Sequence, residues 1–429
     1  MLILPLTRLS KFHFKLPNRR CAKGLLLLVF SLLLVSFSQV STPGYALSLP
    51  ALSPAGLNPV VQVPLQNPNT TTTNSGIAPE QSQPQPPPTF ANRSAWQGYM
   101  SHNPAPQPGC FVATYANPVW QSAQCVTAPS EPFMPSHAQA MLSTWSGGGS
   151  GSDWVAQAPG DVISTSTGSF QSVTTTGETC TCSGGANDYS LQINSNAFPT
   201  NTIYTQPPGG SSFGATGWEQ FIYSTQKGIL IQYWVLGYYT EYSTCPGIGP
   251  PNGISWKQSG GDCYADSPAQ PVPAVPVTSL SSLTLTGNAF NPNLAVSKND
   301  QVTLCGVSNP SGGSCYAVAI TAKVLDLYEN WQDSEFNVFG DASDSLAIFN
   351  SPTTITVVQT LLDQNLKGIV PSCVNKEPET NGFNGFTGES NNLNLGSCAV
   401  SGNFAHSFYV FNRAENRLCK NHDRLLICA

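Results

Sequence analysis

Three apolar stretches of the chain carry polar side chains at alternate positions. Gln192 and Asn194 alternate with apolar residues in YSLQINS, and Glu335 and Asn337 do so in EFNVF. Gln232 interrupts the apolar run GILIQYWVL. Because successive side chains of a strand point to opposite faces, the polar members of each stretch share one face. If these faces adjoin, they form a groove that contains one carboxylate and several amides.

Such a groove has the chemistry of an acid peptidase. Glu335 would act as general base toward a water molecule, and Gln192 or Gln232 would place that water and bind the oxyanion. The chain has 23 Asp and Glu among its 429 residues, so a glutamate inside an apolar strand is uncommon here. The alternative is structural: Glu335 faces solvent, and Gln232 is a core amide with satisfied hydrogen bonds.

Aromatic side chains crowd between positions 218 and 256 and predict a second kind of site. Exposed on a sheet, Trp218, Tyr238, Tyr242 and Trp256 would stack on sugar rings or on an apolar ligand. The alternative is that these side chains belong to the core. We expect two or three of them at best to be exposed.

Other patterns give no cofactor or nucleophile. Asp341 and Asp344 in GDASDS have a spacing that suits Ca²⁺, but Asp-rich turns commonly form without an ion. Cys180-Thr-Cys182 lacks the spacing of a zinc site, and the histidines are scattered. The Gly-x-Ser-x-Gly pattern around Ser212 lies in a Gly/Pro loop, not at a nucleophile elbow. We therefore expect no cofactor.

The composition favours an exported protein with an uncharged polar surface. Lys and Arg number 17 against 23 Asp and Glu, the net charge is −6, and 9% of residues are charged, compared with about 25% in typical soluble domains. No basic patch is present to release counterions from phosphates, which excludes nucleic acid as a partner. The shortage of charge also excludes a coiled coil.

Residues 1–46 have the features of a secretory signal. A basic segment without Asp or Glu precedes the leucine-rich run of residues 24–37, and Gly44-Tyr45-Ala46 follows as a cleavage site. Left uncleaved, residues 24–40 would tether the protein to a membrane, because they approach the ~20 residues of a spanning helix. Residues 47–90, rich in Pro, Thr and Gln, predict a disordered linker.

The cysteines predict a disulfide framework, in keeping with export. Of 13 cysteines, only Cys21 precedes the end of the signal, which leaves an even number. Closeness in sequence favours local bridges within the pairs Cys110/Cys125, Cys245/Cys263, Cys305/Cys315, Cys373/Cys398 and Cys419/Cys428. Whether Cys180 and Cys182 form a bridge stays open.

The pattern of short Val-, Ile-, Thr- and Tyr-rich segments predicts an all-β domain over residues 91–411. We expect a disulfide-stapled antiparallel β-sandwich of jelly-roll type, with strands at 161–173, 189–195, 228–242, 282–286, 301–306, 315–328, 335–340, 345–350, 353–361 and 407–411. Short helices are expected at 138–145 and 361–367. The Pro-rich stretch 246–276 predicts a loop that either divides two lobes or connects two sheets. Residues 412–429 form a C-terminal extension.

Several motifs carry a family resemblance, namely GCF…W…C…AP, GSGSDWVAQAPG, YSLQINSNAF, GWEQFIYS, EFNVFGD and FTGESNNL. In these motifs the chain resembles a family of secreted, uncharacterised bacterial and fungal proteins, which implies export but no activity. The tail 417–429 departs from that family's pattern. In architecture, compartment and residue type the chain also resembles glutamic peptidases of the eqolisin kind and the neprosin family. This resemblance implies acid proteolysis by Glu with Gln, or by two Glu.

Two functions are therefore expected. The first is an extracellular or cell-surface protein that binds glycan or another surface ligand, and the second is a secreted acid peptidase. Catalysis requires Glu335 within hydrogen-bond reach of an amide in an open groove, whereas binding requires exposed aromatic side chains. The sequence leaves open whether the protein is an enzyme.

Overall fold

The computed structural model describes most of the chain beyond the linker. The described residues are 88–134, 154–208, 214–251, 253–291, 293, 299–308, 313–343, 345–374 and 390–400, and the backbone of 407–414, 419–422 and 425–428. Several expectations fall outside the described residues: the signal segment 1–46, nearly all of the linker, the helix at 138–145, Ser212 and Asp344.

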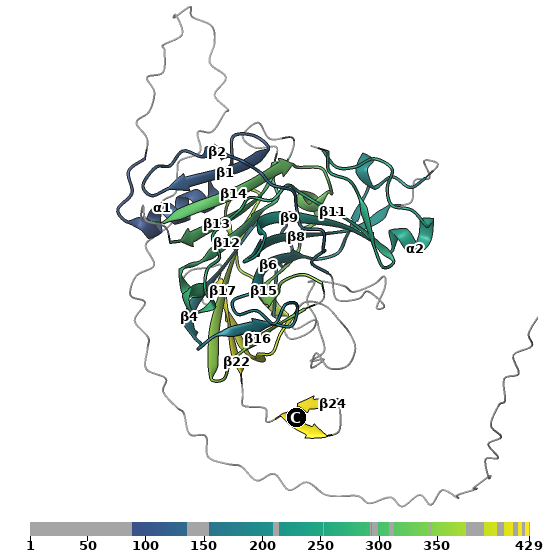
Figure 1. Cartoon of the computed structure of the whole chain (residues 1–429). Helices are drawn as coiled ribbons and strands as arrows, with labels where there is room; N and C mark the ends of the chain where they lie inside the picture. Colours follow the sequence, from purple (N-terminus) through teal and green to yellow (C-terminus); the bar gives the residue numbers. More distant parts are fainter. Residues whose placement is uncertain are drawn as a thin grey trace, which may run out of the picture. The chain divides into compact units, whose positions relative to one another are not determined.

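A ten-stranded antiparallel sheet forms one layer of the fold (Figure 1). Its strands in spatial order are β2 (Gln121–Ala123), β1 (Gly109–Thr114), β14 (Ser314–Thr321), β13 (Asn299–Val307), β12 (Thr284–Asn288), β4 (Ile163–Thr174), β17 (Thr353–Asp363), β22 (Ser407–Ala414) and β21 (Asn394–Val400), with β18 (Gly368–Ile369) beside β17.

A nine-stranded antiparallel sheet forms the second layer. Its strands in spatial order are β10 (Lys257–Ser259), β11 (Asp262–Asp266), β9 (Gly228–Leu236), β8 (Ala215–Ser224), β6 (Tyr189–Ser195), β15 (Asp333–Gly340), β3 (Val155–Gln157) and β19 (Ser372–Val374), with β7 (Phe198–Thr200) beside β8.

The remaining elements are short. β20 (Ser390–Asn391), β16 (Leu346–Phe349) and β5 (Glu178–Cys180) form a small sheet, and β23 (Cys419–His422) pairs with β24 (Leu425–Cys428). The helices are α1 (Arg93–His102), α2 (Tyr238–Tyr242) and α3 (Leu327–Asn330), with 3₁₀ turns at Ile203–Thr205 and Val277–Ser282. Among these described helices, none has the length and apolar character needed to cross a membrane.

The two large sheets face each other across one apolar core. Leu191 and Ile193 of β6 and Ile231 of β9 belong to the same buried cluster as Leu304 of β13 and Val357 of β17. Burying these side chains stabilises the fold by about 25 cal/mol per Å² of apolar surface. The predicted all-β, disulfide-stabilised sandwich is confirmed.

α1 covers the opposite face of the ten-stranded sheet. It begins at Asn92, whose side-chain oxygen accepts a hydrogen bond from the Ala95 backbone N–H at 2.9 Å. Trp96 and Met100, both without solvent exposure, pack against a cluster that includes the buried Cys305. The sequence pattern did not predict this helix, because Trp96 and Met100 are the two apolar residues on its buried face.

Four local expectations were wrong. The strand expected over residues 315–328 ends at Thr321, and α3 begins at Leu327. Residues 361–367 form no helix: Leu361 pairs with Ile369 in a hairpin, and Asp363 accepts backbone N–H bonds from residues 365 and 367. The strand expected to reach residue 242 ends at Leu236, because Gly237 takes a left-handed conformation with φ 69° and α2 follows. The expected loop 246–276 contains β10 and β11, which extend the nine-stranded sheet beyond β9.

Four predicted disulfides are confirmed, namely Cys110–Cys125, Cys245–Cys263, Cys305–Cys315 and Cys373–Cys398. The structure also joins Cys180 to Cys182, which the sequence left open. Cys419 and Cys428 are register partners in the β23–β24 pair. Their side chains lie outside the described residues, so this bridge stays a prediction.

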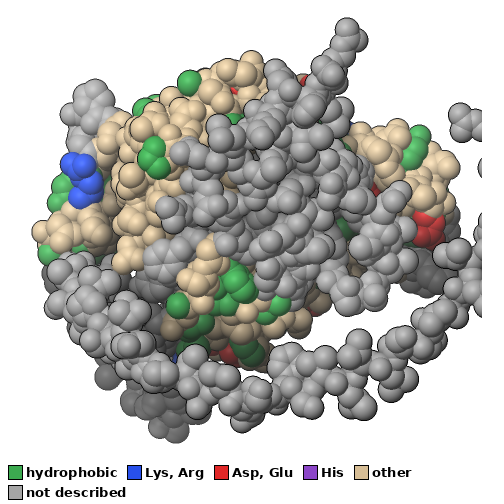
Figure 2. All heavy atoms as spheres, turned by 90° about the horizontal axis from the view of Figure 1, so that it is seen from below, with side chains coloured by type: hydrophobic (Ala, Val, Ile, Leu, Met, Phe, Trp, Pro, Cys, Tyr) green, Lys and Arg blue, Asp and Glu red, His purple; other side chains and the backbone are tan. Residues whose placement is uncertain are grey.

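The described surface visible in Figure 2 consists mostly of uncharged polar side chains and backbone, with few Lys, Arg, Asp or Glu. It has the uncharged polar character expected from the composition.

Gly168 of β4 allows the two sheets to approach closely beneath β15. A Cβ atom at this position would lie 2.2 Å from Cγ of Phe336, which packs from β15 onto β4. We predict that Gly168→Ala lowers the free energy of unfolding by about 1–3 kcal/mol, because the overpacked ring must shift. Guanidinium unfolding of the full chain measures this. Gly98→Ala in α1, where a Cβ meets nothing within 4 Å, is the control and is expected to be neutral or stabilising. Equal effects of the two substitutions would contradict this account of the packing.

Candidate active site on the outer face of the nine-stranded sheet

Five polar side chains form a straight row across the outer face of the nine-stranded sheet. Their strand registers are matched: Glu335 of β15 lies opposite Asn194 of β6, and Asn194 lies opposite Gln220 of β8. Gln220 in turn lies opposite Gln232 of β9, and Gln232 lies opposite Asp266 of β11. We call these five residues the polar row. Strand alternation points them away from the inter-sheet core, since Phe336, Ile193, Phe221 and Ile231, each next in sequence to a member of the row, belong to that core.

Hydrogen bonds join one half of the polar row to the carboxyl group of Glu335. Asn194 Nδ2 donates to Glu335 Oε2 at 2.9 Å. Gln220 Nε2 donates to Asn194 Oδ1 at 3.1 Å and to Gln192 Oε1 at 2.9 Å. The donated bonds therefore run from Gln220 toward Glu335, so each amide dipole favours negative charge at the Glu335 end.

The other half of the polar row runs in the opposite direction, toward Asp266. Gln232 Nε2 donates to Asp266 Oδ1 at 2.5 Å, and the Lys257 ammonium lies 3.2 Å from Asp266 Oδ2. Trp234 Nε1 joins the halves, because it donates to Oε1 of both Gln220 and Gln232 at 3.0 Å. Burial raises the pKa of Asp266, and the contacts with Gln232 and Lys257 oppose that rise.

The structure thus brings the three predicted catalytic side chains into one network. Glu335 and Gln192 are each 1% exposed, and Gln232 is fully buried. Glu335 contacts Asn194 directly, while Gln192 and Gln232 connect to it through Gln220 and its neighbours. The expected amide within reach of the carboxylate is therefore Asn194. The expected open groove is not found, because Glu335, Asn194 and Gln232 are all buried.

Sequence reasoning missed Gln220, Trp234 and Asp266. Gln220 lies in the motif GWEQFIYS, whose alternation of Trp218, Gln220 and Ile222 predicts a strand face that was not considered. Asp266 lies in the stretch that was expected to be a loop, so no strand pattern drew attention to it.

Residues 126–134, which we call the strap, cross this face. The Phe133 backbone N–H donates to Gln232 Oε1 at 3.0 Å, and the Tyr264 hydroxyl donates to the Ser130 carbonyl at 2.9 Å. The Phe133 ring is fully buried in a cluster with Ile222 and Leu230. The strap therefore covers the Gln232 end of the polar row.

The predicted ligand-binding aromatics fall into two groups. Trp218 has no solvent exposure and packs beside Trp234 and Tyr264 on the flank of the polar row. Tyr238, Tyr242 and Trp256 pack around the Cys245–Cys263 bridge, and Tyr238 is 3% exposed. The four side chains do not form one exposed platform, and a role in binding stays a prediction.

A pair of buried carboxyl groups lies between the two sheets. Glu219 of β8 is fully buried, and neither of its carboxyl oxygens has a hydrogen-bond partner among the described residues. Asp300 of β13 is 2% exposed, and its Oδ1 accepts the Phe290 backbone N–H at 3.2 Å. Burial holds the pKa of both groups well above the usual range, and Asp300 raises that of Glu219 further. Both carboxyl groups are therefore protonated in acid solution.

A second group of buried acids surrounds the turn after β5. The Asp188 backbone N–H donates to Glu178 Oε2 at 3.2 Å. Burial raises the pKa of Glu178 to about 8; the Asp188 backbone N–H opposes this rise, while the charges of the Asp188 and Asp341 carboxyl groups add to it. Burial also raises the pKa of Asp341 to about 7; a hydrogen bond with Ser224 and the charge of Lys227 oppose this rise, and Asp188 adds to it. Asp344, the other half of the calcium pattern, lies outside the described residues.

Among the described residues, the one group with metal-ligand proximity is Cys180, Cys182 and Asp188. Both sulfur atoms are joined in a disulfide, which removes them as thiolate ligands. The polar row offers amides, which are weak metal ligands, and two carboxyl groups at opposite ends.

Comparison of the chain with models of protein families, with curated proteins and with solved structures returns no match. The two resemblances noted in the sequence stay predictions, and the case for a function rests on the geometry.

Stability is expected to fall as the pH rises, because the folded protein holds the protons of its buried acids more tightly than the unfolded chain. Unfolded Asp and Glu titrate near pH 4, so this stabilisation is complete below about pH 4. It is lost as the pH passes about 7 for Asp341 and about 8 for Glu178. Each such group lowers the free energy of unfolding by up to ~1.4 kcal/mol per pH unit.

We predict that Glu178→Gln flattens this decline, since the variant has one proton fewer to lose. Urea unfolding at half-unit steps between pH 4 and 8 measures the slope. Asp161→Asn, at an exposed position, is the control and is expected to keep the wild-type slope. A wild-type slope in Glu178→Gln would contradict the assignment of a protonated Glu178.

Proposed function

We propose that the protein is a secreted acid peptidase whose general base is Glu335. The observation that carries the proposal is the polar row, in which one carboxyl group is hydrogen-bonded to Asn194 and continues into Gln220 and Gln232. A carboxylate beside a row of carboxamides is suited to activating water and to stabilising an oxyanion. Export is supported by five disulfides, which form in oxidising compartments.

The reaction requires no group beyond these side chains. Glu335 removes a proton from a water molecule, and the water oxygen attacks the carbonyl carbon of the scissile peptide bond. Amide N–H groups of the row bind the oxyanion of the tetrahedral intermediate. Glu335 then returns the proton to the amine that leaves as the C–N bond breaks.

Acid working conditions agree with the electrostatics of the fold. Glu219, Asp300, Glu178 and Asp341 are all buried, and the pKa of each is raised. A fold that is most stable when these groups are protonated suits an enzyme that acts at low pH.

Substrate access requires the strap to move. Its Phe133 N–H donates to Gln232 in the manner of an extended peptide main chain, and its flanking side chains fill the apolar surfaces on both sides of the row. At the Gln232 end of the row the strap thus occupies the place in which a substrate chain would lie, and the described arrangement is closed at that end.

Glu335→Gln is expected to lower kcat/KM for denatured protein substrates by about 10²–10⁴-fold, because the amide cannot accept a proton from water. Initial rates of peptide-bond cleavage between pH 2 and 7 measure the loss. Gln keeps the size of the side chain and can still accept from Asn194, so the fold is expected to persist in the near-UV circular dichroism.

The exposed Glu241 provides the matched control, and Glu241→Gln is expected to cleave at the wild-type rate. Retained activity in folded Glu335→Gln would overturn the proposal. So would the absence of cleavage at every pH both in the wild type and in the strap variant described next.

Phe133→Ala is expected to raise the initial rate of cleavage several-fold, because the strap loses the ring that anchors it against Ile222 and Leu230. A short peptide with a fluorescent reporter measures the rate at acid pH. Ile203→Ala removes a side chain of 61% exposure and is expected to change nothing. A folded Phe133→Ala protein with an unchanged rate would show that the strap does not limit access.

A further inference from the structure

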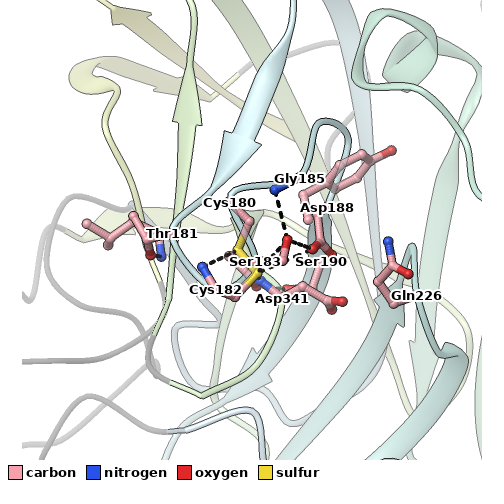
Figure 3. The surroundings of a disulfide bond; sticks show 12 residues. Cys180, Thr181, Cys182, Ser183, Gly185, Asp188, Ser190, Gln226 and Asp341 are labelled. Atoms are coloured by element: carbon pink, nitrogen blue, oxygen red, sulfur yellow. Dashed lines mark hydrogen bonds between the residues drawn. A yellow bond between two sulfur atoms is a disulfide. The ribbon is translucent and has the colours of Figure 1, made fainter.

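The Cys180–Cys182 disulfide differs from the other bridges in the loop that it closes (Figure 3). Its cysteines are separated by 2 positions, whereas the four other bridges span separations of 10 to 25. A cross-link restricts the unfolded chain less as its loop becomes shorter. Of the five bridges, this one therefore adds least to the free energy of unfolding. Stabilisation of the fold does not explain why it is present.

Its two sulfur atoms differ in accessibility. Cys180 is 2% exposed, whereas Cys182 is exposed, as are its neighbours Thr181 and Ser183. Cys182 is the single exposed residue among the ten cysteines whose burial the structure describes. Of the two cysteines, Cys182 is therefore the one that is open to a thiol from solution in the folded chain.

The surroundings of the buried Cys180 sulfur favour negative charge on it. Cys180 Sγ accepts the backbone N–H of Cys182 at 3.1 Å and the backbone N–H of Asp341 at 3.5 Å. Both donors come from the fixed backbone, so they would stabilise a thiolate at Cys180 as soon as the S–S bond opened. A stabilised thiolate is the better leaving group in thiol–disulfide exchange.

The exposed sulfur has the opposite surroundings. Asp188 Oδ2 lies 3.5 Å from Cys182 Sγ, and Ser183 Oγ donates to the same carboxyl oxygen, as the dashed line in Figure 3 shows. A carboxyl oxygen at this distance disfavours negative charge on Cys182. The two sulfurs are thus distinguished as an electrophile at Cys182 and a leaving group at Cys180.

We propose that Cys180–Cys182 is a thiol-exchange site that accepts electrons from external thiols. An incoming thiolate attacks Sγ of Cys182, the S–S bond breaks, and its electron pair stays on Sγ of Cys180. A second thiolate attacks the sulfur of the first thiol in the mixed disulfide and releases Cys182. Two thiols are oxidised to one disulfide, the protein pair is reduced to two thiols, and the two protons of the thiols are taken up by Cys180 and Cys182.

Graded mixtures of reduced and oxidised glutathione test the proposal on the full oxidised chain at pH 7.5. Alkylation after different times, followed by peptide mass mapping, reports each bridge separately. We expect Cys180–Cys182 to be reduced at least about tenfold faster than Cys373–Cys398, the half-buried control bridge, while the far-UV and near-UV circular dichroism stay native.

The site of the adduct tests the assigned direction. In Cys180→Ser, oxidised glutathione is expected to leave a stable mixed disulfide on Cys182, because the resolving sulfur is absent. In Cys182→Ser the buried Cys180 is expected to react at least about tenfold more slowly.

Three results would overturn the proposal. They are reduction of Cys180–Cys182 only together with the other bridges, adduct formation at Cys180 faster than at Cys182, and free thiols at both positions that oxidised glutathione fails to join. All three are read by mass and not by peptide cleavage, so they are independent of the proposed peptidase activity.

Discussion

The matched register of β15, β6, β8, β9 and β11 is the constraint on which the candidate site depends. It aligns Glu335, Asn194, Gln220, Gln232 and Asp266 in one line. A slip of one residue in any of these strands would turn its polar side chain into the inter-sheet core and place an apolar one on the outer face. The apolar inner residues of the same strands make such a slip costly, so the core of the sandwich also fixes the geometry of the site.

Buried carboxyl groups give the fold a preference for acid, in keeping with the proposed peptidase activity. Glu219 and Asp300 lie between the sheets, and Glu178 and Asp341 lie near the ends of β5 and β15. Glu219, Asp300 and Glu178 have no cationic partner among the described contacts, so their deprotonation leaves a buried charge that no cation compensates, whereas Ser224 and Lys227 partly compensate a charge on Asp341. The conditions that favour the fold are therefore those in which a glutamic peptidase would work.

The disulfides divide by their physical role. Four bridges close loops of 10 to 25 residues and tie neighbouring strands together. The fifth lies beside Asp188 and Asp341, which directly precede β6 and follow β15, the two strands that carry Asn194 and Glu335. The short bridge thus lies at the ends of β6 and β15, the same two strands that carry Asn194 and Glu335 of the polar row.

The sequence by itself determined the all-β class, most strand positions, four bridges and the face on which Glu335, Gln192 and Gln232 lie, because alternation and cysteine spacing are local properties. It could not determine that Asn194, not Gln192, meets Glu335, nor that Trp234 joins the two halves of the row, because strand order and register depend on contacts distant along the chain. Only the tertiary structure brought the strap onto Gln232 and placed the Asp341 backbone beside Cys180, since those contacts link residues separated by 99 and 161 positions.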